Sequence, residues 1–266
     1  MIIIGEKINS TIKNVYTAIE NSDAPFIQEL AVKQYKAGAN YIDVNAGMFY
    51  QDEPQKLEWL IKTIQEVTDA PFSIDSPNSA AISAALKTNK NGKPIINSIT
   101  CEKKRFESIL PLVLEYNTGV IALCMDDGGI PETVEDRLKL ADRIVGELTD
   151  KGIKPGDIYI DPIVQPIVAG SQYGVIALET MRAIKNRYPD VHIACGLSNI
   201  SFGLPARKII NHAFLIAAMT SGMDGAILDP LDKRLMSYLY AAEALLGRDQ
   251  FCMNYLSKYR ENLIEC

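Results

Sequence analysis

Short apolar runs alternate with longer amphipathic stretches along the whole chain. Each run is rich in β-branched or other apolar residues, and each ends at a polar residue or a glycine. This pattern predicts eight strands, at residues 1–4, 41–45, 72–75, 94–97, 120–125, 158–161, 192–196 and 225–229.

The stretches between these runs predict helices. Residues 24–39, 131–148 and 230–247 repeat apolar side chains at helical spacing. A glycine ends the first stretch, and Pro131 with acidic residues begins the second. Strands that alternate with helices indicate parallel βαβ units, which build either an open doubly wound sheet or a closed barrel.

Length and glycine spacing favour the barrel. The first predicted strand is followed by Gly5 alone and not by the GxGxxG pattern of dinucleotide-binding open sheets. Eight βα units fill a (β/α)8 barrel of about 250 residues. We therefore predict an α/β protein with a TIM barrel, a single domain over residues 1–266, and a C-terminal helix at about 249–265.

Composition narrows the class of protein. Hydrophobic residues make up 47% of the chain and charged residues 23%, and the net charge is −6. An acidic chain lacks the basic stripe of a nucleic-acid-binding protein. With neither a signal-peptide pattern nor an apolar run of about 18 residues, we expect a cytoplasmic protein that contacts no membrane.

Cysteine and histidine form no metal or catalytic pattern in the sequence. The five cysteines have no CxxC spacing, and their odd number argues against a disulfide framework. Cys124 and Cys195 end apolar runs, as small buried hydrophobic residues do. His192 and His212 lie apart, so we expect neither a zinc site nor a Ser-His-Asp triad.

Polar residues gather where the predicted strands end, and in a barrel these ends form the active site. Arg207 is the main basic residue there. Carboxylates accept hydrogen bonds and Asn both donates and accepts, which suits a neutral planar ligand with several N–H donors, such as a pterin. The acidic, amide and hydroxyl residues of the set are Glu6, Asn9, Asp43, Asn45, Asp75, Asn97, Asp126, Asp127, Asp161, Ser198, Asn199 and Asp229.

Two other interpretations use the same residues. Asp and Asn are common N-caps, so capping alone explains any single position. It explains Asp75, Asn97 and Asp161 less well, because polar groups buried at the ends of apolar strands are costly without a partner. The adjacent pair Asp126 and Asp127 is the candidate for a divalent cation, although we expect no bound metal.

Ordered along nearly the whole chain, the motifs resemble the folate-binding methyltransferase family. They read IIGEKIN, DVNAG, SIDSPN, INS, YIDP and GLSNISFGLPAR, and the SNxSFG pattern after the seventh strand is the most specific. The family includes methyltetrahydrofolate:corrinoid/iron–sulfur protein methyltransferases, the folate module of cobalamin-dependent methionine synthase, and the methylcorrinoid:tetrahydrofolate methyltransferases of demethylase systems.

The resemblance implies a pterin-binding barrel like that of dihydropteroate synthase. It implies methyl transfer, in either direction, between N5 of tetrahydrofolate and the cobalt of a corrinoid (cobalamin). In this family pattern Asp75, Asn97 and Asp161 hold the pterin, and Asn199 hydrogen-bonds N5, where a donor would stabilise the charge that develops. The resemblance also implies, through less specific motifs, four further residues beside the pterin: Glu6, Asn9, Ser198 and Arg207.

Partners follow from the same resemblance. The chain lacks the DxHxxG pattern of cobalamin modules, so we expect the corrinoid on a separate protein. Family members commonly form homodimers, and we expect one here. Gly196 and Gly203 flank the Ser-Asn pair and predict a flexible loop that admits a bulky corrinoid.

Departures from the family pattern leave alternatives open. Two departures lie at the predicted rim: the Asp pair at 126–127, where relatives often have Asn or another polar residue in place of one Asp, and Gln165, where an apolar residue is common. Both concern the preference for partner or substrate. Dihydropteroate synthase is the nearest rival enzyme. It handles phosphate with a Ser-Arg-Lys type pattern, where this chain reads LSNIS. A non-catalytic folate-binding barrel is the remaining alternative, and the presence of the implied pterin residues argues against it.

Overall fold

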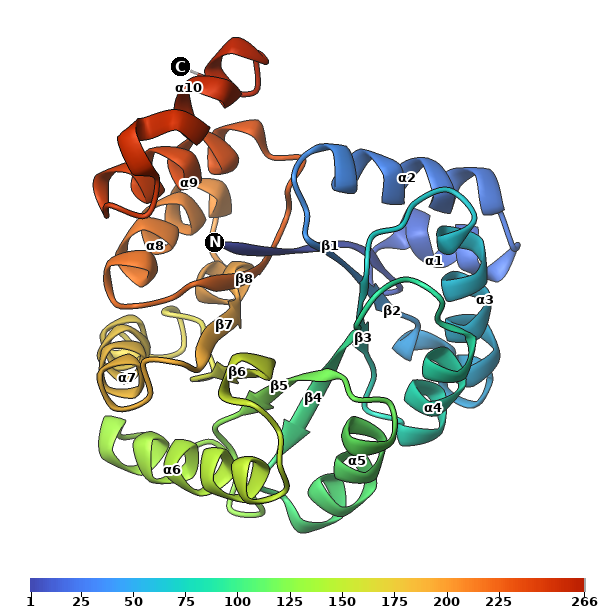
Figure 1. Cartoon of the computed structure of the whole chain (residues 1–266), viewed down its shortest axis with the longest axis horizontal. Helices are drawn as coiled ribbons and strands as arrows, with labels where there is room; N and C mark the ends of the chain where they lie inside the picture. Colours follow the sequence, from blue (N-terminus) through green and yellow to red (C-terminus); the bar gives the residue numbers. More distant parts are fainter. Residues whose placement is uncertain (266) are drawn as a thin grey trace.

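Eight parallel strands close into a barrel in sequence order, and helices surround it (Figure 1). The computed structural model describes residues 1–265. The sequence prediction of a TIM barrel is confirmed. Its strands are β1 (Ile2–Asn9), β2 (Tyr41–Asn45), β3 (Phe72–Asp75), β4 (Ile95–Thr100), β5 (Gly119–Leu123), β6 (Ile158–Asp161), β7 (His192–Gly196) and β8 (Gly225–Leu228).

Helices α2 to α9 each follow one strand, whereas α1 and α10 lie outside this repeat. The predicted helices at 24–39, 131–148 and 230–247 are confirmed as α2, α6 and α9. They begin after N-caps at Asp23, Thr133 and Asp232, whose side chains accept from helix amides. The helices are α1 (Lys13–Glu20), α2 (Ala24–Lys36), α3 (Glu53–Gln65), α4 (Ser79–Thr88), α5 (Lys103–Glu115), α6 (Val134–Asp150), α7 (Tyr173–Arg187), α8 (Arg207–Thr220), α9 (Lys233–Leu245) and α10 (Met253–Arg260).

Two strands run further than the apolar pattern predicts. The first was expected to end at residue 4 and continues to Asn9, with a register shift between Gly5 and Ile8. The fourth was expected to end at Asn97 and continues to Thr100, with a shift between Asn97 and Ile99. Bulges of this kind interrupt the alternation of side chains without ending the strand, so sequence periodicity stops too early.

The predicted C-terminal helix at 249–265 is shorter than expected. A 3₁₀ turn at Gln250–Cys252 precedes α10, and Phe251 and Cys252 have φ of 54° and 55°. The Asp249 carboxylate accepts from the amides of Asn254 and Tyr255, both at 2.9 Å, and thereby starts the helix at this point. Helix α10 lies against α9 at the edge of the molecule (Figure 1).

The barrel interior is apolar below its polar mouth. Ile4, Ile95, Ile121, Tyr159 and Ala194 form this inner core, and a larger core packs the outer side of the strands against the helices. Side chains inside a small barrel fill it completely. The interior therefore forms a firm floor for whatever lies at the carboxyl ends of the strands.

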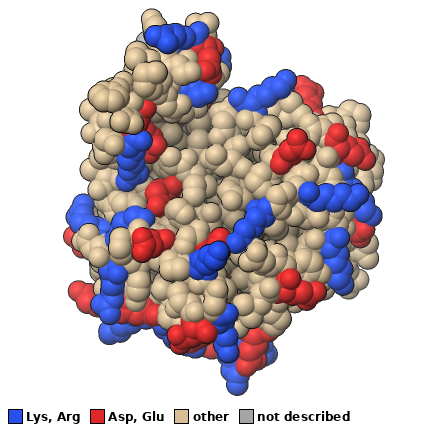
Figure 2. Space-filling view, in the orientation of Figure 1, with Lys and Arg blue, Asp and Glu red and all other residues tan. Residues whose placement is uncertain are grey.

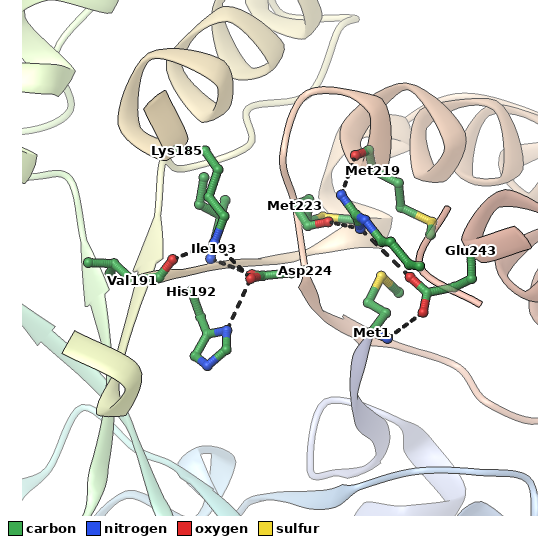
Figure 3. A network of polar contacts seen from close by, with 10 residues as sticks. Met1, Lys185, Val191, His192, Ile193, Met219, Met223, Asp224 and Glu243 are labelled. Atoms are coloured by element: carbon green, nitrogen blue, oxygen red, sulfur yellow. Dashed lines mark hydrogen bonds and ion pairs between the residues drawn. The ribbon is translucent and has the colours of Figure 1, made fainter. Parts of the chain in front are cut away.

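A polar network lies at the opposite end, where the strands begin (Figure 3). His192, the first residue of β7, places Nδ1 3.1 Å from the Asp224 carboxylate. The same carboxylate pairs with Lys185 at 3.0 Å and accepts from the Ile193 amide at 2.8 Å. This histidine thus joins α7, β7 and β8 far from the carboxyl ends of the strands.

The surface mixes charges of both signs. Basic and acidic side chains are interspersed over the face shown in Figure 2. Within residues 1–265, no helix is both long enough and apolar enough to cross a bilayer. A protein that binds no nucleic acid and lies in the cytoplasm stays a prediction.

Candidate functional site

A row of polar residues crosses four neighbouring strands at one level. The strand register pairs Asn9 with Asn45, Asn45 with Asp75, and Asp75 with Asn97. Residues in register on neighbouring parallel strands share a side of the sheet. The sequence spaces these residues widely, and barrel closure places them next to one another.

All eight residues expected at the site line a single cavity at the carboxyl ends of the strands. Its volume is about 540 Å³, within the range of ligand-binding pockets. Leu123 and Ile227 of the inner core form its apolar floor. Its full lining is Glu6, Lys7, Asn9, Thr11, Ile12, Asp43, Asp75, Asn97, Ser98, Leu123, Asp161, Gly196, Ser198, Asn199, Arg207 and Ile227.

Burial disfavours the ionised form of the cavity carboxyl groups. It raises the pKa of Asp161 to about 7, against a smaller lowering by the Ile163 amide and Arg137. It raises the pKa of Asp75 to about 6. Burial and the nearby Asp229 carboxylate raise the pKa of Glu6 to about 7. The cavity therefore holds acceptors that are poorly solvated and change charge near neutral pH.

Asp43 is a cavity residue that the resemblance did not assign. It lies on β2 with 2% of its surface exposed and accepts from Ser73 Oγ at 2.6 Å and Asn97 Nδ2 at 3.4 Å. Burial and the Asp75 carboxylate raise its pKa well above the usual range. Its place two residues before Asn45 in the DVN motif was the available signal, because alternate strand residues face the same side.

Asn45 organises the mouth of the cavity from the β1 and β2 side. Its Nδ2 donates to Asp75 Oδ2 at 2.9 Å. Its Oδ1 accepts from Ser10 Oγ and from the Gly47 amide, both at 3.0 Å. One amide therefore fixes the Asp75 carboxylate and the two loops that follow the strands.

The Ser-Asn pair lies in a short 3₁₀ helix, Leu197–Ser201, directly after β7. Leu197, Ile200 and Ser201 are buried and anchor this segment, whereas Asn199 is exposed. The flexibility expected from its glycines stays a prediction. Gly203 has φ of 80°, which favours glycine, whereas Gly196 has φ of −70°. At Gly196 the reason is space, because an added Cβ would lie 2.9 Å from Asn199 Nδ2.

Arg207 closes the same side of the cavity. Its Nη2 donates to the Ser198 carbonyl at 2.7 Å, and its Nε donates to Ser201 Oγ at 3.1 Å. The guanidinium thus holds the 3₁₀ segment that carries Asn199. An adjoining cavity of about 230 Å³ shares Glu6, Ser198 and Arg207 with the main one.

The two rim departures have structural partners. Asp126 Oδ1 accepts from the Gly128 amide at 2.9 Å, and Asp127 Oδ2 accepts from the Lys103 amide at 3.2 Å. Gln165 Oε1 accepts from Arg137 Nη2 at 2.5 Å, which accounts for a polar residue there. Across residues 1–265, no cluster of three or more His, Cys, Asp or Glu is arranged to hold a metal ion.

Known proteins of similar sequence are pterin-binding enzymes and methyltransferases. The family described as pterin binding enzyme matches residues 5–229. A methylcorrinoid:tetrahydrofolate methyltransferase of Eubacterium limosum is 39% identical over 99% of this chain and 98% of its own length. Methionine synthase of Mycobacterium tuberculosis is 30% identical over 86% of this chain, which corresponds to 20% of that longer protein.

Solved structures of dihydropteroate synthases share the fold. The Xanthomonas albilineans enzyme in complex with 7,8-dihydropteroate superposes with a TM-score of 0.69 at 16% identity, over 94% of this chain and 93% of that chain. At this identity the likeness concerns the fold alone. The resemblance to folate-linked methyltransferases and the prediction of a methyltransferase are confirmed by the sequence relatives. The chain belongs to the family of pterin binding enzymes.

Proposed function

We propose that this protein transfers a methyl group between the cobalt of a corrinoid on a partner protein and N5 of tetrahydrofolate. One observation carries the proposal: the similarity to the Eubacterium limosum methylcorrinoid:tetrahydrofolate methyltransferase runs over nearly the full length of both chains. That relative's name supports transfer from the corrinoid to the folate as the working direction.

The pterin would lie in the 540 Å³ cavity on its apolar floor. A pterin presents a 2-amino group beside ring N–H groups, and carboxylates accept such pairs of donors. In our proposal Asp75, Asn97 and Asp161 hold this edge. Buried acceptors without a ligand are costly, so the raised pKa values of Asp75 and Asp161 fit groups that await a hydrogen-bonding partner.

The methyl group then moves between two nucleophiles. In the working direction the N5 lone pair forms the new N–C bond, the cobalt–carbon bond breaks, and its electron pair stays on cobalt. N5 becomes positively charged and loses its proton. Asn199 contacts N5 and either donates or accepts as its charge changes. Glu6 lies in the same cavity, and a pKa of about 7 suits it to take up or supply the N5 proton.

Two experiments test this proposal in order. Titration with tetrahydrofolate and methyltetrahydrofolate by calorimetry should give saturable binding that Asp75→Ala or Asp161→Ala weakens. Absence of binding at submillimolar ligand would overturn the folate assignment. Asn199→Ala should then keep pterin binding and lose turnover with methylcobalamin, whereas unchanged turnover would remove Asn199 from the reaction. A wild-type protein that binds tetrahydrofolate but shows no turnover would support the non-catalytic folate-binding barrel.

The partner and the assembly are part of the proposal. The corrinoid is expected on a separate protein, and co-purification with corrinoid proteins of the same cell tests this. A homodimer is expected from the family resemblance and is tested by sedimentation. Dihydropteroate synthase activity is the rival, and an assay with p-aminobenzoate and a pterin pyrophosphate should show no product if methyl transfer is the activity.

A further inference from the structure

Arg137 is a buried cation outside the barrel wall. It lies on α6, and α6 packs beside α7 (Figure 1). None of the surface of Arg137 is exposed. Within the described residues it forms no ion pair with a carboxylate, and it donates to oxygens of neutral groups. A buried charge is costly unless its donors are satisfied. The four hydrogen bonds of Arg137 satisfy these donors, so its burial depends on the acceptors that surround it.

Three of its four acceptors lie on the loop that leaves β6. Arg137 Nη1 donates to the carbonyls of Pro162 and Ile163, both at 2.8 Å. Nη2 donates to Gln165 Oε1 at 2.5 Å, and Nε donates to the Pro131 carbonyl at 2.9 Å. The guanidinium thus binds Pro162, Ile163 and Gln165 after β6 and ties them to the segment that precedes α6.

This loop has an unfavourable backbone. Ile163 has φ of 62°, a region that β-branched residues rarely enter, and such conformations persist only where the surroundings enforce them. In this conformation the Ile163 amide donates to Asp161 Oδ1 at 2.7 Å. The same turn that Arg137 holds therefore fixes the orientation of the Asp161 carboxyl in the cavity.

We infer that Arg137 is a positioning residue for Asp161, acting through the carbonyls of Pro162 and Ile163, with Gln165 completing the guanidinium's set of acceptors. The inference rests on the proposed role of Asp161 in holding the pterin. It assigns to Gln165 the function of binding the guanidinium, in place of the role in partner or substrate preference that the sequence suggested. It also assigns a function to a helix residue that does not line the cavity.

A double-mutant cycle separates positioning from general stability. The variants are Arg137→Met, Asp161→Asn and the pair together, and the readout is the tetrahydrofolate Kd by calorimetry. Arg137→Met should raise Kd on the order of tenfold in the wild-type background. It should raise Kd far less in the Asp161→Asn background, because residues that act through one another are not additive. Arg143→Met, an exposed arginine of the same helix, is the matched control and should leave Kd unchanged.

The outcomes distinguish the two proposals. If wild-type protein binds and Asp161→Asn does not weaken binding, the assigned role of Asp161 fails. If Asp161→Asn weakens binding but Arg137→Met has no effect, or has an equal effect in both backgrounds, the positioning role fails while the proposed function stands.

A milder variant covers the case in which Arg137→Met does not fold. Gln165→Leu removes one acceptor and should raise Kd about threefold. In protein labelled with ¹⁵N-isoleucine, the NMR signal of the Ile163 amide should lose the chemical shift typical of a hydrogen-bonded proton. Its amide proton should also exchange with solvent faster in this variant than in the wild type. An Ile163 signal and a Kd identical to wild type would overturn the inference.

Discussion

The amide of Asn199 lies against the backbone of Gly196, three residues earlier. A Cβ at Gly196 would lie 2.9 Å from Asn199 Nδ2 and 3.4 Å from its Cγ. Contacts under about 3 Å between carbon and nitrogen force a shift, since interiors are packed to van der Waals distance. The glycine that ends β7 thus leaves space for the side chain proposed to contact N5.

Gly196→Ala should therefore displace Asn199. We expect methyl transfer to fall on the order of tenfold or more, because an electrostatic contact to the reacting atom depends on position, and we expect a smaller change in pterin affinity. Rates with methylcobalamin and Kd values by calorimetry check this. Gly146→Ala, in α6 with no heavy atom within 4 Å of the added Cβ, is the control and should retain full activity. Equal losses of rate and affinity in Gly196→Ala would contradict a specific effect on Asn199.

Pterin affinity should depend on pH through the cavity carboxyl groups. The pKa is about 6 for Asp75 and about 7 for Asp161. The ionised form accepts a pair of N–H donors through its two oxygens more strongly than the protonated form, whose O–H is itself a donor. Tetrahydrofolate should bind more tightly as pH rises from about 5 to about 8. Calorimetry across this range measures the effect, and Asp161→Asn should remove the step near pH 7. A pH-independent Kd in wild-type protein would rule out this use of the carboxylates.

Asp161 should also destabilise the ligand-free protein at neutral pH. Its pKa is raised from 3.8 to about 7 on folding, so the folded state disfavours the charge that the unfolded chain carries. This contribution is absent below about pH 4, grows between about pH 4 and about pH 7, and is constant above. Asp161→Asn should raise the free energy of unfolding at pH 8, since Asn can still accept from the Ile163 amide.

Thermal or urea unfolding at two pH values tests that gain. We expect Asp161→Asn to be more stable than the wild type at about pH 8, by a margin that shrinks toward about pH 4. Such a gain is typical of active-site residues that are kept for function at a cost in stability. Asp190→Asn, at an exposed surface carboxylate, serves as the control. A gain of the same size at both pH values would show that charge burial is not its cause.

Arg105 should hold the β3 and β4 side of the cavity. It donates to the carbonyls of Ser76, Pro77 and Ser98, and its charge lowers the pKa of Asp75 against the effect of burial. Arg105→Met should raise the Asp75 pKa above about 6 and weaken tetrahydrofolate binding near neutral pH, on the order of tenfold.

The pH profile of Kd identifies this effect of Arg105, because the step that belongs to Asp75 should move to higher pH. Lys104→Met, at the exposed neighbouring residue, should leave the profile unchanged. If Arg105→Met weakened binding by the same factor at every pH, its role would be limited to the backbone of the two loops.

Sequence periodicity determined the fold class because a parallel barrel strand is a short apolar run whose length and polar end are local features. Six of the predicted strands lie within two residues of the observed ones at either end, and the chemistry at their ends pointed to one face. The exceptions were β1 and β4. Register shifts after Gly5 and after Asn97 interrupt the alternation of side chains there, so the pattern does not indicate that these strands continue.

Only the tertiary structure decided which polar residues meet and in what state. The register that pairs Asn45 with Asp75 depends on barrel closure, and the buried position of Asp43 depends on what surrounds it. The roles of Arg137 and Gln165 depend on a contact between α6 and the loop after β6, 28 residues apart in sequence. Local sequence specifies backbone preference and burial, whereas charge state and partner choice arise from long-range contacts that the sequence alone does not display.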